Sequence, residues 1–170
     1  MKKSLYFFFL LFLSIGCSDT GSSKPESISS ILLKAYQAKS ISDGANFLIQ
    51  KGYKLSRKIE NKVLPQSITM LEFEGDRLIS LKAVENNITE LTCLTNQIDE
   101  VASLKEDLIK NFNFKLEQRK LAVNQTIKTD IYSNDQIVAK IVTANNKDGK
   151  GSISSISFKQ KNKIPYLKSF

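Results

Sequence analysis

The two cysteines, Cys17 and Cys93, carry the only thiols in the 170-residue sequence. A thiol acts as a nucleophile in its thiolate form, which needs a nearby base or a positive environment. The sequence contains no histidine, so Ser-His-Asp and Cys-His catalytic systems and every histidine-containing metal site are excluded. Two cysteines so far apart also cannot build a structural zinc site or a disulfide scaffold. We therefore expect no metal and no cofactor.

Cys17 follows an N-terminal segment that is typical of an export signal. Lys2 and Lys3 precede an unbroken apolar run over residues 5–13. This run is too short to span a hydrocarbon core of about 30 Å. Gly16, a small residue, lies directly before Cys17, and the order Leu-Ser-Ile-Gly-Cys resembles the lipobox of bacterial lipoproteins. It departs from the strongest lipoboxes by having Ser14 where they have leucine.

The lipobox resemblance implies that the Cys17 thiol receives a diacylglycerol and that the chain is cleaved between Gly16 and Cys17. Acyl chains anchor a protein to the membrane because each buried CH₂ contributes about 0.8 kcal/mol. Ser18 after the cysteine resembles the signal that sorts lipoproteins to the outer rather than the inner membrane. An exported protein is not expected to meet nucleic acid. An ordinary secretory signal with an incidental cysteine is the alternative.

Other candidate catalytic groups carry weak signals. Cys93 lies between a threonine and a leucine and is expected to be a buried apolar filler. Glu72 and Glu74 are two apart on a predicted strand and so share a face; paired carboxylates can hydrolyse sugars, but this spacing is also typical of a solvent-facing sheet surface. A Ser-Lys dyad stays open in principle, although no signature frames one. We predict that the protein is not an enzyme and has no catalytic residue.

Positive charge is concentrated toward the C-terminus. The net charge is +8 for the whole sequence, and no acidic residue follows Asp148. A basic end on an anchored domain can approach anionic lipid or an acidic protein partner, and a solvated lysine-rich tail is the alternative. The residues expected to make such contacts are Lys150, Lys159, Lys161, Lys163 and Lys168.

The rest of the sequence predicts an α+β protein. After a signal peptide over residues 1–16 and a lipidated flexible tether over residues 17–24, we expect one α-β-β-β-β repeat over residues 25–95. A second such repeat follows over residues 96–160, and a basic tail over residues 161–170 ends the chain. The predicted fold is two tandem repeats with antiparallel meander sheets.

Internal similarity underlies the predicted repeat. Residues 67–80 align without a gap on residues 126–139, and residues 48–55 resemble residues 108–116 with one insertion. Each copy is small enough that its core would be marginal alone. The order of elements resembles the secreted beta-lactamase inhibitor protein and small envelope lipoproteins with related half-domains.

Turn dipeptides and periodicity set the expected elements. Gly75-Asp76, Asn86-Asn87 and Asn134-Asp135 are turn signals between alternating strands. We expect Glu26 in the first turn of a helix, Ser42 or Asp43 as the cap of a second helix that Gly52 ends, and Thr95 or Asn96 as the cap of a third. Strand alternation predicts burial of Ile79, Leu81, Val138 and Val142.

These observations predict a lipid-anchored envelope lipoprotein that acts as a non-enzymatic protein-binding module of inhibitor or immunity type. Its partner would be a protein in the periplasm or at the cell surface. The alternative is a structural or assembly factor of the outer-membrane envelope.

Overall fold

The computed structural model describes residues 26–63, 66–122, 126–145 and 151–161. These residues form three helices and eight strands. The first half contains α1 (Ile28–Tyr36), α2 (Ile41–Gln50), β1 (Lys54–Val63), β2 (Gln66–Glu74), β3 (Leu78–Val84) and β4 (Asn87–Thr95). The second half contains α3 (Ile98–Lys110), β5 (Lys115–Leu121), β6 (Ile127–Ser133), β7 (Ile137–Asn145) and β8 (Ser152–Gln160).

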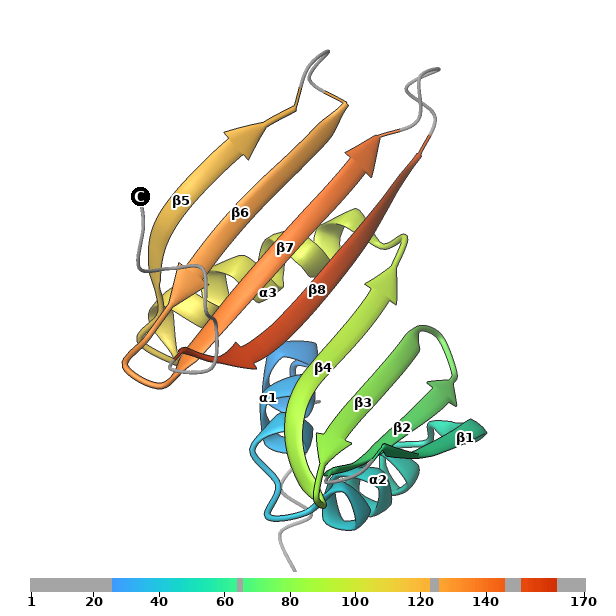
Figure 1. Cartoon of the computed structure of the whole chain (residues 1–170). Coiled ribbons are helices and arrows are strands. Elements are labelled where there is room, and N and C mark those ends of the chain that lie inside the picture. Colours follow the sequence, from blue (N-terminus) through green and yellow to red (C-terminus); the bar gives the residue numbers. More distant parts are fainter. Residues whose placement is uncertain (1–25, 64–65, 123–125, 146–150, 162–170) are drawn as a thin grey trace, which may run out of the picture.

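All eight strands belong to one antiparallel sheet, in the spatial order β1-β2-β3-β4-β8-β7-β6-β5. Each half is therefore a four-stranded meander, and pairing of β4 with β8 joins the two meanders edge to edge. The helices lie behind the sheet in Figure 1, with α3 behind β6–β8. The predicted α+β class is confirmed.

Two of the predicted turns lie where the sequence indicates. Gly75 and Asp76 separate β2 from β3, and Asn134 and Asp135 separate β6 from β7. The turn between β3 and β4 lies one residue earlier than expected, because Glu85 and Asn86 adopt positive φ angles of 50° and 68°. Two consecutive left-handed residues give the twist that a tight hairpin needs.

The expected starts of the three helices were wrong by one or more residues. Ser27 caps α1, so Glu26 precedes the helix, and its carboxylate pairs instead with Lys34 and Lys51, each at 2.6 Å. Ser40 caps α2, in place of Ser42 or Asp43, by accepting a hydrogen bond from the Asp43 N–H at 3.1 Å. Gln97 precedes α3, in place of Thr95 or Asn96, and makes no side-chain cap.

The core lies between the helices and one face of the sheet. Its largest fully buried side chains include Phe73 and Phe158 from the sheet and Leu32, Leu48 and Leu104 from the three helices. The ring of Tyr36, at the end of α1, packs against Phe158 with 6.2 Å between ring centroids. One continuous core therefore spans both halves of the sheet.

The sequence predicts burial of Ile79, Leu81, Val138 and Val142, and the structure confirms this for the first three. Ile79 and Leu81 are fully buried beneath the helices, and Val138 is also buried. The prediction for Val142 is wrong, since this residue is half-buried on the face opposite the helices. The reason is that β7 is apolar on both faces: Ile137, Ala139 and Ile141 take the helix-facing positions, and the two valines point the other way.

Candidate functional site

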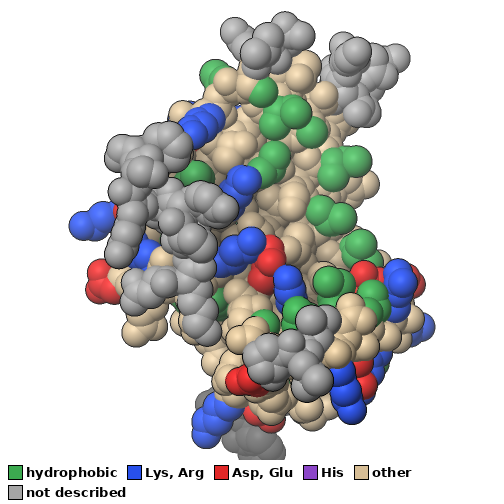
Figure 2. Space-filling view, viewed as in Figure 1, with side chains coloured by type: hydrophobic (Ala, Val, Ile, Leu, Met, Phe, Trp, Pro, Cys, Tyr) green, Lys and Arg blue, Asp and Glu red, His purple; other side chains and the backbone are tan. Residues whose placement is uncertain are grey.

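One face of the sheet is covered by no helix in the described part of the chain, and we call it the open face. Its apolar side chains come from alternate positions of neighbouring strands: Leu78 is paired with Leu94, and Ser155 lies between Leu94 and Val142. Figure 2 shows hydrophobic side chains in a band over this face, among lysines and acidic residues. The apolar residues of the open face include Leu78, Leu94, Ile127, Ile131, Val138, Val142 and Ile153.

Several of these side chains are strongly exposed. Relative exposure is 40% for Leu78, 39% for Leu94 and 60% for Ile153. Contiguous exposed apolar surface is uncommon in monomeric soluble proteins and is typical of interaction sites. The open face therefore has the character of a binding surface.

A shallow groove of about 380 Å³ crosses the middle of the open face, over β4, β8, β7 and β6. Thr92, Ser155 and Ser157 supply hydroxyl groups in the groove, and Ile131 and Val142 supply apolar surface. A cross-strand ion pair forms part of its lining, with the Lys159 Nζ 3.0 Å from the Glu90 Oε1. The groove can thus offer hydrogen bonds, apolar contact and charge to one ligand.

The predicted basic contact residues are only partly described by the structure. Lys159 lies in the open-face groove, and its charge is balanced by Glu90. Lys161 donates hydrogen bonds to the Ser133 Oγ at 3.1 Å and the Asn134 carbonyl at 3.3 Å, next to the β6–β7 turn. Lys150, Lys163 and Lys168 lie outside the described residues, as do Gly16 and Cys17.

Much of the positive charge of the described residues lies on the two outer strands. An outer strand has unpaired backbone groups that invite edge-to-edge aggregation, and charged side chains oppose this. Strand β1 carries Lys54, Arg57, Lys58 and Lys62, and β5 carries Lys115, Arg119 and Lys120. These basic residues of β1 and β5 lie at the two edges of the sheet, where charge opposes edge-to-edge pairing, and they are different residues from the predicted basic contacts.

Asp130 is the most deeply buried charged residue in the described part of the chain, with 1% exposure. It lies on the helix side of β6. Its carboxylate accepts hydrogen bonds from Lys105 of α3 at 2.8 Å and from Arg119 of β5 at 2.7 Å. Burial alone would raise the pKa of Asp130, but these two hydrogen bonds outweigh it and hold the pKa below its usual value. The Asp130 carboxylate therefore connects α3 and the edge strand β5 to β6.

Arg77 makes a second largely buried connection, between the first half and α3 of the second half. Its guanidinium donates to the Tyr53 hydroxyl at 2.8 Å and to the Glu100 Oε2 at 2.9 Å. Glu100 lies in the first turn of α3, whereas Arg77 follows the β2–β3 turn. Most of the arginine side chain is removed from solvent, at 10% exposure, so this ion pair connects the two halves through a largely buried contact.

The candidate catalytic groups lie in unfavourable surroundings for chemistry. Cys93 is fully buried, as predicted, and burial raises the pKa of its thiol to about 12, so it is not a thiolate at neutral pH. Glu72 and Glu74 occupy alternate positions on β2, as predicted, with Glu74 exposed and Glu72 half-buried. No group of three acidic or cysteine side chains suited to a metal ion occurs among the described residues.

None of the helices in the described part of the chain has the length and hydropathy needed to span a bilayer. Comparison of the chain with protein-family models, with curated proteins and with solved structures finds no match.

Proposed function

We propose that this protein is a lipid-anchored envelope lipoprotein whose folded part binds another protein on the open face of its sheet. The observation that carries the proposal is the one-sided architecture: helices cover one face, and leucine and isoleucine side chains stand exposed on the other. An inhibitor of a secreted hydrolase, or an immunity protein against a delivered toxin, would use such a surface.

The composition of the open face favours a protein partner. Protein interfaces combine an apolar centre with a polar rim and with hydrogen-bonding groups. Leu94 and Val142 supply apolar area, while the Glu90–Lys159 pair and Lys140 supply charge around it. Charges at such a rim affect the orientation of the partner and the rate at which it associates more than they affect its affinity.

A rigid scaffold supports this role. The surface is formed by paired strands rather than loops, and the core behind it is continuous. A pre-formed surface loses little conformational entropy on binding, so more of its contact energy is available as affinity. We propose a binding role rather than an enzymatic one because Cys93, the only described thiol, is buried and protonated.

The anchor and location in this proposal rest on the sequence. Acylation of Cys17 would hold the protein on the membrane, and Ser18 supports sorting to the outer membrane. The residues between Cys17 and α1 would then act as the tether between lipid and folded part.

We further propose that the chain consists of two tandem α-β-β-β-β repeats. Three features support it. Each half has its first strand at an edge of the sheet and its last strand at the centre, with the other two in sequence order between them. The outer pairs β1–β2 and β5–β6 have register shifts at corresponding places, between Leu55 and Arg57 and between Leu116 and Gln118.

The third feature is the connection from helix to outer strand. The Tyr53 N–H donates to the Leu48 carbonyl at 3.1 Å, and the Phe114 N–H donates to the Leu108 carbonyl at 2.9 Å. A residue with positive φ precedes each donor, Gly52 in one half and Asn113 in the other. The one-residue insertion between the aligned segments is absorbed inside this loop.

Replacing Leu94 with aspartate tests the binding surface. We expect the full chain carrying Leu94→Asp to recover its partner at least tenfold less efficiently from envelope extract than the original protein does, since a carboxylate at the centre of an interface must be desolvated. The measurement is quantitative mass spectrometry of proteins captured by each form.

Ile109→Asp is the matched control for Leu94→Asp. Ile109 lies on α3, away from the open face, and is 49% exposed. It should recover the partner like the original protein. Equal recovery by all three forms, or equal loss in both variants, would contradict binding on the open face.

A further inference from the structure

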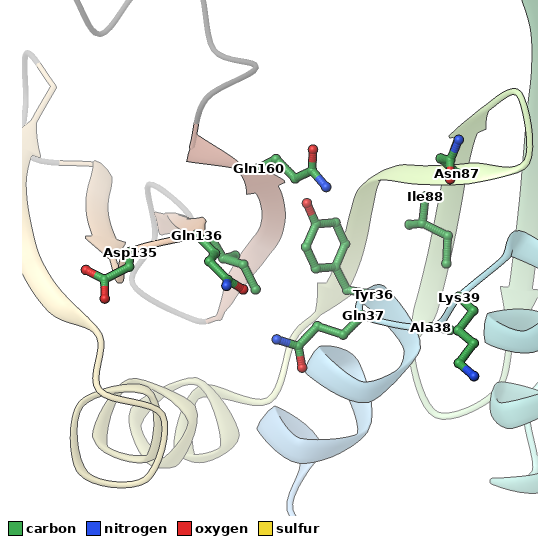
Figure 3. A pocket seen from close by; sticks show the side chains of 10 residues that line it. Tyr36, Gln37, Ala38, Lys39, Asn87, Ile88, Asp135, Gln136 and Gln160 are labelled. Carbon is green, nitrogen blue, oxygen red and sulfur yellow. The ribbon is translucent and has the colours of Figure 1, made fainter.

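A second cavity, which we call the seam cavity, lies where the two halves meet. It has a volume of about 540 Å³ and lies between the end of α1, the start of β4, the β6–β7 turn and the end of β8. Small-molecule sites in proteins range from about 300 to 1,000 Å³. Figure 3 shows that both halves contribute: Gln37 and Asn87 come from the first, and Gln136 and Gln160 from the second.

The Tyr36 hydroxyl at this cavity lacks a partner. Tyr36 is 5% exposed, and its Oη is the one buried side-chain polar atom without a hydrogen bond among the described residues. Figure 3 shows the hydroxyl directed into the space beside Gln160. Burial, with a smaller contribution from Glu90, raises the pKa of Tyr36 to about 12, so the group is a donor at neutral pH. An unpaired buried donor is costly, and a ligand acceptor would remove that cost.

The side chains that line the seam cavity around Tyr36 indicate which kind of ligand would fit it. Four lining side chains are amides, and each amide both donates and accepts hydrogen bonds without carrying charge. The charged members, Lys39 and Asp135, have opposite signs and favour no ionic ligand on balance. Ile88 and Ile137 add a small apolar area. The amide residues are Gln37, Asn87, Gln136 and Gln160.

We propose that the seam cavity binds a neutral acetamido sugar. The Tyr36 hydroxyl would donate to the acetamido carbonyl oxygen, the amide side chains would pair with the sugar hydroxyls, and Ile88 would contact the acetyl methyl group. The cavity is lined by different residues from the open-face groove. The inference therefore stands or falls independently of the proposed protein-binding function.

The test is an NMR titration of the full chain with N-acetylglucosamine and its β-1,4-linked dimer. The protein is held in a detergent without a sugar head group, so that the detergent does not compete. We expect saturable shifts of Tyr36 and Gln160 signals, and affinity about tenfold lower in Tyr36→Phe, since one hydrogen bond to a buried donor is lost. Without ligand, Tyr36→Phe should melt at the same or a higher temperature, because it removes an unpaired polar atom.

Tyr53→Phe is the matched control for the same chemical change. Its hydroxyl accepts a hydrogen bond from Arg77 at 2.8 Å and lies outside the cavity. This variant should melt at a lower temperature and bind the sugar with unchanged affinity. The proposal is overturned if neither sugar shifts these signals, if Tyr36→Phe binds like the original protein, or if an N-acetylated dipeptide amide binds at Tyr36 in preference to the sugars.

Discussion

Replacing Asp130 with alanine is expected to lower the free energy of unfolding by about 2 kcal/mol, because the hydrogen bonds from Lys105 and Arg119 to the buried carboxylate are lost. The carboxylate is 1% exposed and joins α3, β5 and β6. Its loss should therefore loosen the whole outer part of the second half. Chemical denaturation followed by circular dichroism measures the change.

Asp135→Ala is the control, since Asp135 is an exposed residue of the β6–β7 turn. It should shift the unfolding midpoint little, because surface substitutions usually change stability by less than about 0.5 kcal/mol. If Asp130→Ala lowered the free energy of unfolding as little as Asp135→Ala does, the hydrogen bonds of Asp130 would not stabilise the second half.

The same carboxylate gives stability a defined pH dependence. Its pKa is held below the usual value in the folded protein, so its contribution is present above the unfolded pKa of about 3.9 and is lost as pH falls through the folded pKa. We expect the original protein to lose stability on acidification below about pH 4 more steeply than Asp130→Ala. If the free energy of unfolding fell equally steeply with pH in both proteins, Asp130 would not be the source of this pH dependence.

Cys17→Ser should abolish lipidation and signal cleavage. Without a thiol to acylate, the precursor cannot receive its lipid, so it should accumulate uncleaved and incorporate no labelled fatty acid. Since Cys17 is the one predicted acylation site, the loss of fatty-acid label and of the cleaved form should be close to complete. Cell fractionation with metabolic labelling measures it.

Cys93→Ala is the matched thiol control. Cys93 is fully buried beneath the helices, so this variant should stay acylated and membrane-bound and lose only about 1 to 2 kcal/mol of stability. A cleaved and soluble original protein, or label that disappears with Cys93 instead, would contradict the anchor.

The strands were predictable because their signals are local. Gly75-Asp76 and Asn134-Asp135 separate alternating segments, and both pairs lie at the expected hairpins. Gly52 was correctly read as the end of α2, where its φ of 92° suits glycine. Cys93 was expected in the core because it lies between Thr92 and Leu94 and because its partner in the second repeat is Phe158.

The features that depend on distant contacts were not predicted. Asp130 lies on a strand, where aspartate is depleted, and this was the one signal for its network; its partners, Lys105 and Arg119, come from other elements. Val142 was misplaced because β7 is apolar on both faces, so alternation alone did not identify the face toward the helices. The role of Tyr36 depends on how β8 and the β6–β7 turn meet α1.

Site-specific photo-crosslinking in living cells tests most directly whether the open face binds a protein. A photoreactive residue at Thr92, in the open-face groove, is compared with one at Ile109 on α3. We predict a discrete protein adduct from Thr92 and none from Ile109. A protein adduct from Ile109 alone, or none from either position, would contradict binding on the open face.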